Sequence, residues 1–209
     1  MKLYITVLFS FLFCCSEAQV FKTKLLTGNN NEAAFKIISS YDGGFIVSGY
    51  TKSYTHGDRD IYVAKYDHDL NLQWTKSIGT AALEFPEGII ETSAHEILMA
   101  FNNCNAGICD IVLTKMDESG NILWNKSYYY YEDNYSIDLR ETPGKNYAVL
   151  SKEGSLDAGS RIMLTDTAGN IISTKAIETT AHINSRFASA LPDGFIIFGG
   201  SYLVLTTGQ

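Results

Sequence analysis

One segment of this chain has the residue types and spacing of a metal-binding loop. The run Asp67-His68-Asp69-Leu70-Asn71 has the D-x-D-x-N opening of a calcium loop, whose later positions should be glycine and a bidentate glutamate. Those later positions are Leu72 and Ile78, and the corresponding segments at Asp117 and Asp166 lack the second carboxylate. A hairpin turn closed by the first aspartate accounts for all three copies, so we favour a turn and predict no metal site.

Five tyrosines fall within eight residues, beside Glu132 and Asp133, and form the most unusual local feature of the sequence. Exposed tyrosine rings next to carboxylates can stack on sugars or serve as a protein hot spot. The alternative is that the rings pack in turn on two neighbouring sheets. We favour packing and keep the segment as a candidate binding surface. The five residues are Tyr128, Tyr129, Tyr130, Tyr131 and Tyr135.

No group of residues predicts catalysis or a cofactor. The sequence has no G-x-S-x-G, H-E-x-x-H, P-loop or dinucleotide-binding motif, and its four histidines are scattered. Asp60 and Asp110 each stand before an apolar run, where an aspartate typically closes a turn or caps backbone N–H groups. Trp74 and Trp124 occupy the same place in two similar segments, and packing between sheets is a better interpretation of them than a sugar platform.

These residues recur because the chain contains internal repeats. Residues 60–76, DIYVAKYDHDLNLQWTK, align without a gap with residues 110–126, DIVLTKMDESGNILWNK, and every offset is 50. A weaker third copy covers residues 161–175, at an offset of 49 from the second. A fixed period of this length is typical of repeat architectures. We therefore expect units near residues 35–84, 85–134, 135–184 and 185–209.

Each repeat divides into four short runs of β-forming residues with turn signals between them. In the first unit the runs are residues 35–39, 45–51, 60–66 and 70–77. Four antiparallel strands per unit, repeated in tandem, predict an all-β fold, a β-propeller of four-stranded blades, with a β-sandwich or β-solenoid as alternatives. Because residues 20–27 resemble a fourth strand, we expect either a four-bladed ring closed by that strand or an incomplete part of a larger propeller.

A family resemblance follows from the same pattern. The segments DGGFIVSGYT and GDRDIYVAKYDHDLNLQWTKSIG resemble the tandem β-propeller repeats of secreted proteins from Bacteroidetes-type bacteria. The resemblance covers Phe35 to about Phe198 and is strongest in the first two units. It implies a propeller fold and an exported protein, and it supplies no catalytic residue because proteins of this kind are mostly uncharacterised.

The first 18 residues predict export. MKLYITVLFSFLFCCSEA has one lysine, an apolar run and small residues before a cleavage point near Ala18, as in a secretory signal peptide. The run is too short for a comfortable membrane span, so we expect none, and we expect a secreted, periplasmic or cell-surface protein. Cys104 and Cys109 would then meet an oxidising compartment, where we expect a local disulfide in preference to two free thiols.

The net charge of the chain argues against one class of partner. The 209 residues carry a formal net charge of −7, with 16 basic and 23 acidic side chains, which argues against a nucleic-acid partner. We predict a secreted, non-enzymatic propeller that binds a protein or a glycan. The alternatives are a glycan-active hydrolase with two facing carboxyl groups in the central channel, and a truncated product without function.

Overall fold

The computed structural model describes residues 30–53, 56, 58–129, 134–153, 160–177, 187–190, 196–199 and 204–206. All regular structure in this part of the chain is β-strand, so it holds no helix long and apolar enough to cross a membrane. The expected signal peptide at residues 1–18 and the expected strand at residues 20–27 lie outside the described residues. The prediction of an all-β fold is confirmed.

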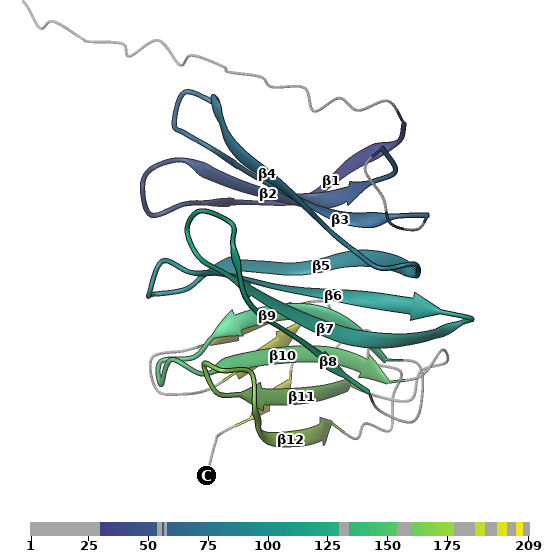
Figure 1. Ribbon diagram of the computed structural model, residues 1–209. Coiled ribbons are helices and arrows are strands. Elements are labelled where there is room, and N and C mark those ends of the chain that lie inside the picture. The colour runs from purple at the N-terminus through teal and green to yellow at the C-terminus, as the bar shows by residue number, and fades with distance from the viewer. Residues whose placement is uncertain are drawn as a thin grey trace, which may run out of the picture.

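The strands form successive antiparallel sheets, each built from neighbours in sequence, which we call blades (Figure 1). Blade 1 contains β1 (Glu32–Ser39), β2 (Phe45–Thr51), β3 (Asp60–Tyr66) and β4 (Leu72–Ile78). Blade 2 contains β5 (Leu83–Glu91), β6 (Ile97–Asn105), β7 (Ile108–Met116) and β8 (Ile122–Tyr128). Blade 3 contains β9 (Asn134–Glu141), β10 (Tyr147–Glu153), β11 (Ser160–Thr165) and β12 (Ile171–Ile177). A further sheet contains β13 (Phe187–Ala190), β14 (Ile196–Gly199) and β15 (Val204–Thr206).

The blades are arranged as in a propeller, with the first strand of each on a common axis. Strand β1 contacts β5, β5 contacts β9, and β9 contacts β13, whereas the fourth strands β4 and β8 are largely exposed. Blades 1 to 3 therefore lie as successive layers, and the twist of each sheet is visible in Figure 1. Four-stranded antiparallel blades were predicted from the repeat, and the three complete sheets confirm them.

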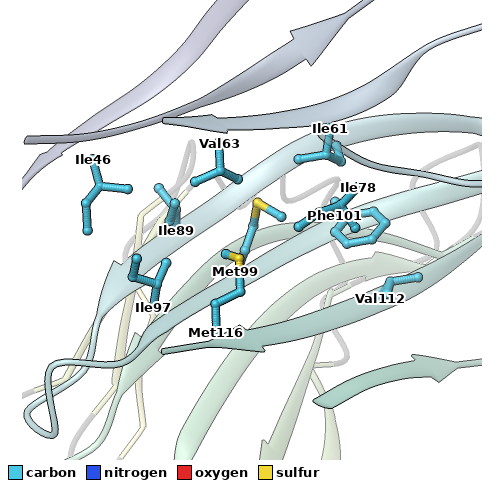
Figure 2. Packing of buried hydrophobic residues seen from close by; sticks show 10 residues of the cluster. All are labelled: Ile46, Ile61, Val63, Ile78, Ile89, Ile97, Met99, Phe101, Val112 and Met116. Atoms are coloured by element: carbon cyan, nitrogen blue, oxygen red, sulfur yellow. The ribbon is translucent and has the colours of Figure 1, made fainter. Parts of the chain in front are cut away.

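The core lies between blades, and strand β6 supplies both sides of it. Its Ile97, Met99 and Phe101 belong to the cluster shared with blade 1, which Figure 2 shows. Its Leu98 and Ala100 belong to a second cluster shared with blade 3. Because side chains alternate across a strand, a continuous apolar run is required wherever both faces of a sheet are covered.

The hairpin between the third and fourth strands of each blade is closed by an aspartate, as the turn interpretation predicts. Asp67 Oδ1 accepts the backbone N–H groups of Asp69 and Asn71, both at 2.8 Å, and its Oδ2 accepts the Asn71 side-chain amide at 2.9 Å. Asp117 and Asp166 make the same three bonds in blades 2 and 3. These bonds lower the pKa of all three carboxyl groups. Both carboxylate oxygens are thus engaged with N–H donors rather than held open for a cation.

The fourth residue of this five-residue turn, directly before the asparagine, has a left-handed backbone conformation. It is Gly120 in blade 2 and Gly169 in blade 3, both at φ 77°, and Leu70 in blade 1, at φ 64°. A Cβ built on Gly120 would also lie 3.0 Å from the Trp74 ring of the preceding blade. Glycine is therefore favoured in blade 2 both by its backbone conformation and by the nearby Trp74 ring.

We expect Gly120→Ala to lower the free energy of unfolding by about 1–3 kcal/mol, because a left-handed alanine is strained and meets the Trp74 ring. The matched change Leu70→Gly relieves the same strain in blade 1 and should leave stability unchanged or raise it by up to about 1 kcal/mol. Urea unfolding followed by tryptophan fluorescence measures both. Equal effects of the two changes would contradict this account of the turn.

The two cysteines face each other across the β6–β7 hairpin. Cys104 pairs with Cys109 in the strand register, their Cα atoms are 4.0 Å apart, and a disulfide joins them. The intervening turn places Ala106 and Gly107 at φ 51° and 86°, the left-handed pair that a two-residue hairpin needs. The disulfide therefore joins the two strands beside a turn in which Ala106 has an unfavourable left-handed backbone conformation.

A thiol count under denaturing conditions should find no free thiol at these cysteines until reductant is added. Removing the bridge with the double substitution Cys104→Ser/Cys109→Ser should lower the free energy of unfolding by about 2 kcal/mol, as expected for a short closed loop. Thermal unfolding of the oxidised and reduced protein gives the comparison. Two free thiols in protein purified from an oxidising compartment would contradict the bridge.

Candidate functional site

An open hollow of about 510 Å³ lies at one end of the axis, where the first strands of the blades turn back. We call it the axial hollow. Its walls come from the ends of β1, β5 and β9 and from the hairpin turns that follow β1 and β5. The lining residues are Ser39, Tyr41, Glu91, Thr92, Ser93, His95 and Glu141.

Equivalent positions in successive blades supply the carboxylates of the hollow. Glu91 ends β5 and Glu141 ends β9, at the place that Ser39 occupies in β1. Glu91 Oε2 accepts the backbone N–H of Tyr41 at 2.7 Å. Glu141 accepts the backbone N–H and the hydroxyl of Ser93 at 2.8 and 2.9 Å. Each glutamate therefore bonds to the turn of the preceding blade, and this fixes its direction at the axis.

Within the described residues, the turn of blade 3 cannot offer the same backbone donor to a following blade. The residue that corresponds to Tyr41 and Ser93 in the blade 3 turn is Pro143, which has no N–H to donate. The strand that would offer the next acceptor, β13, ends at Ala190. Among the described residues, the carboxylates that line the hollow come from blades 2 and 3, and blade 1 has Ser39 at the equivalent place.

Two aromatic rings meet at the rim of the hollow. The Tyr41 and His95 ring centroids are 3.8 Å apart and the rings are tilted by 39°. Tyr41 is 79% exposed, so its outer face is open to solvent. His95 has φ 62°, a left-handed backbone that ends the turn after β5. A flat aromatic surface therefore lies beside two carboxylates and the Ser93 hydroxyl.

A second group of polar side chains lies deeper on the axis, and we call it the axial charge cluster. Lys36 Nζ, from blade 1, lies 3.3 Å from Asp138 Oδ1 of blade 3, so the contact reaches past blade 2. Both Arg140 terminal nitrogens approach the same carboxylate at 2.8 Å. Glu87 Oε1 accepts the Asn102 amide at 3.2 Å. Burial raises the pKa of Glu87 to about 7, against a smaller opposing effect of Lys36.

The geometry of the inner strands explains why these side chains converge. The strand register shifts between Ala34 and Lys36 in β1, between Pro86 and Gly88 in β5, and opposite Leu150 and Ser151 in β9. A bulge bends a strand and re-aims its side chains. Lys36, Glu87 and Asp138 precede the last residues of their strands by three or four positions, which is roughly 10–13 Å at 3.3 Å per residue. Arg140 adjoins Glu141 and turns its side chain back to Asp138.

The tyrosines predicted as a candidate binding surface have different surroundings in the structure. Tyr128 is buried, and its hydroxyl donates to the Gly169 carbonyl of blade 3 at 2.6 Å. Tyr129 is 59% exposed, and Tyr135 lies in β9. Tyr130 and Tyr131 lie outside the described residues. The first ring of the group therefore packs between blades, and the second is at the surface.

Both tryptophans lie at blade junctions. Trp74 Nε1 donates to the Glu118 carbonyl of blade 2 at 3.0 Å, and Trp124 Nε1 donates to the Thr167 carbonyl of blade 3 at 3.2 Å. Each indole also packs against the core cluster beneath it. The rings are thus placed for packing between blades rather than for stacking on a sugar.

The two repeated aspartates have different surroundings. Asp60 begins β3 and is fully buried, and its Oδ2 accepts the His56 backbone N–H at 3.0 Å. Asp110 is the third residue of β7, because the tight disulfide hairpin lets that strand begin earlier, at Ile108. Glu84 is buried near Asp60, and burial, together with the Asp60 charge, raises the pKa of Glu84. Within the described residues, no three His, Cys, Asp or Glu side chains are grouped to hold a metal ion.

The residues of the hollow were not identified from the sequence. A signal was available, because Glu91 and Glu141 are 50 residues apart and both stand just before a hairpin turn. The charge cluster had no such signal, because the equivalent positions Lys36 and Asp138 carry opposite charges and Glu87 lies at the bulge of β5.

Comparison with known proteins supports the fold. No protein-family model and no curated protein matches the chain. A solved structure of a protein of unknown function from Dyadobacter fermentans matches with a TM-score of 0.55 and 15% identity, over 78% of this chain and 54% of that one. A candidate gluconolactonase matches with a TM-score of 0.50 and 11% identity, over 81% and 56%. A protein of unknown function from Bacteroides caccae matches with a TM-score of 0.49 and 18% identity, over 66% and 46%.

These matches indicate a shared fold and nothing finer. The chain spans about half the length of the solved structures it matches. The expected likeness to Bacteroidetes propeller proteins is thus supported at the level of the fold, by the Dyadobacter structure.

We expect Glu87→Gln to stabilise the protein at high pH and not at low pH. A pKa raised from 4.5 to about 7 means that the contribution of Glu87 is full below about pH 4.5 and is lost as the pH rises through 7. Glutamine keeps the acceptor for Asn102 and has no charge to bury. At pH 8 the variant should be more stable by about 1–2 kcal/mol, with no difference at pH 4.

Urea unfolding at the two pH values measures this difference. The control is Glu118→Gln, an exposed turn residue that should show no such pH dependence. A Glu87→Gln variant that is less stable than the parent at both pH values would show that the carboxylate is held charged.

Proposed function

We propose that this chain is an exported, non-enzymatic binding module and that its ligand is a carbohydrate held in the axial hollow. The observation that carries the proposal is the exposed Tyr41 ring, backed by the partly buried His95 ring, which lines an open hollow together with Glu91 and Glu141. Aromatic rings present a flat apolar face, and carboxylates accept hydrogen bonds from hydroxyl groups. Ligand sites typically combine such surfaces with a few polar groups that fix orientation.

Export is supported by two features of different kinds. The first 18 residues have the charge, apolar run and small residues of a signal peptide. The Cys104–Cys109 bridge suits an oxidising compartment, where polysaccharides and glycoproteins would be accessible to an exported protein.

Hydrolysis of a glycan is the second candidate function, and one observation favours it. Glu87 lies on the axis with a pKa raised to about 7, as a general acid requires. A glycosidase also needs a second carboxyl group across the bond to be cleaved. Asp138 is the other carboxylate of the cluster, and it is occupied by Lys36 and Arg140. We therefore place binding first.

A glycan array followed by calorimetry on the best oligosaccharide tests the proposal. Tyr41→Ala and His95→Ala should each weaken binding about tenfold or more, since truncated aromatic anchors typically cost that much. The matched control is Tyr129→Ala, which removes an exposed tyrosine outside the hollow and should leave affinity unchanged. Thermal unfolding confirms that each variant is folded.

Two results would overturn this assignment. If Tyr129→Ala abolished binding and Tyr41→Ala did not, the tyrosine-rich segment would be the binding surface. If the protein released reducing sugar from the bound oligosaccharide and Glu87→Gln abolished that release, the chain would be a hydrolase.

A further inference from the structure

The charges of the axial hollow specify a ligand class. We infer that the hollow recognises a positively charged amine, as carried by an amino sugar with a free amino group. This inference rests on the proposed carbohydrate function and narrows it. It begins from the two glutamates, Glu91 and Glu141, for which no ion pair exists within the part of the chain that the structure describes.

The other acidic groups of the neighbouring turns are neutralised. Asp42 Oδ2 lies 2.8 Å from Lys65 Nζ, and Glu96 Oε2 lies 2.5 Å from Lys115 Nζ. The carboxylates of the hollow instead accept bonds from uncharged donors, the backbone and hydroxyl groups of the preceding turn. Such bonds orient a carboxylate and leave its negative charge uncompensated. Among the described side chains, the two negative charges of the hollow therefore have no partner cation.

The aromatic rim adds a second attraction for a cation. A cation over the face of a tyrosine ring is attracted by the negative face of the π system. Tyr41 is 79% exposed and forms a wall of the same hollow as the two glutamates. An ammonium group has three N–H donors, so it can bond to a carboxylate of the hollow while its sugar ring lies against the aromatic face. A neutral sugar would use the ring and would leave the two charges without a counter-ion.

The axial charge cluster limits how far such a ligand can enter. The Lys36 ammonium and the Arg140 guanidinium both bind the carboxylate of Asp138, which precedes Glu141 by three residues in β9. Their positive charges disfavour an amine at that depth. The arrangement therefore holds the cationic group at the mouth, between Glu91, Glu141 and Tyr41.

The test compares one sugar with and without its charge. Calorimetry at low salt would measure the binding of a glucosamine tetramer and of the same tetramer fully N-acetylated, in a buffer where the free amine is protonated. The charged tetramer should bind at least tenfold more tightly, and its affinity should fall as salt is added. Glu91→Gln and Glu141→Gln should each reduce that affinity about tenfold and leave binding of the acetylated tetramer unchanged.

Glutamine keeps one oxygen to accept the backbone N–H of Tyr41 or Ser93, and its NH2 group can donate to the Ser93 hydroxyl oxygen, so both variants should fold. The matched control is Glu118→Gln, which removes the same charge from a turn on the outer part of blade 2 and should leave both affinities unchanged.

The outcomes separate this inference from the proposed function. Equal affinity for the two tetramers would overturn the inference and leave carbohydrate binding intact. Binding of neither tetramer, with no glycan bound on the array, would overturn both. Binding of a lysine-rich peptide in place of any sugar would overturn the carbohydrate ligand and assign the two glutamates to a protein partner.

Discussion

The structure depends on the burial of both faces of each interior blade. A four-stranded sheet with an apolar run in its second strand exposes two hydrophobic faces, and neither can remain in water. Strand β6 shows the constraint, since Ile97 and Met99 face blade 1 while Leu98 and Ala100 face blade 3. No blade can therefore fold stably by itself, and tandem repetition is the solution that this sequence uses.

Hydrophobic packing alone would allow neighbouring blades to slide over one another. Polar contacts at the outer edge and at the axis fix the position of each blade on the next. At the outer edge, the indole N–H groups of Trp74 and Trp124 bind turn carbonyls of the next blade. At the axis, Glu91 and Glu141 bind turn N–H groups of the preceding blade. Both sets lie at the same end of the strands, where the first and third strands of a blade turn back, so each junction is held at its inner and its outer edge.

Repetition also explains what could be predicted from the sequence. The aspartate turns and the tryptophans recur at offsets of 49–50 because every blade needs the same outer half, so strands and turns could be read from Asp67, Asp117 and Trp74. The inner strands are less regular. They contain bulges, and their exposed positions change from Ser39 to Glu91 to Glu141 because those residues are not needed for packing. The candidate site therefore lies where the repeat pattern is weakest. Contacts such as that of Lys36 with Asp138 form only when blades 1 and 3 are brought together at the axis, so the sequence does not predict them.

Pro143 has a consequence for the symmetry of the molecule. A propeller of similar blades presents nearly equivalent positions around its axis, and a ligand there would meet several equal orientations. Because Pro143 lacks an N–H, the turn of blade 3 cannot offer the same backbone donor to a following blade. Together with the change from Ser39 to Glu91 and Glu141, this proline makes the described blades non-equivalent at the axis, so a ligand there would meet a different set of polar groups on each blade.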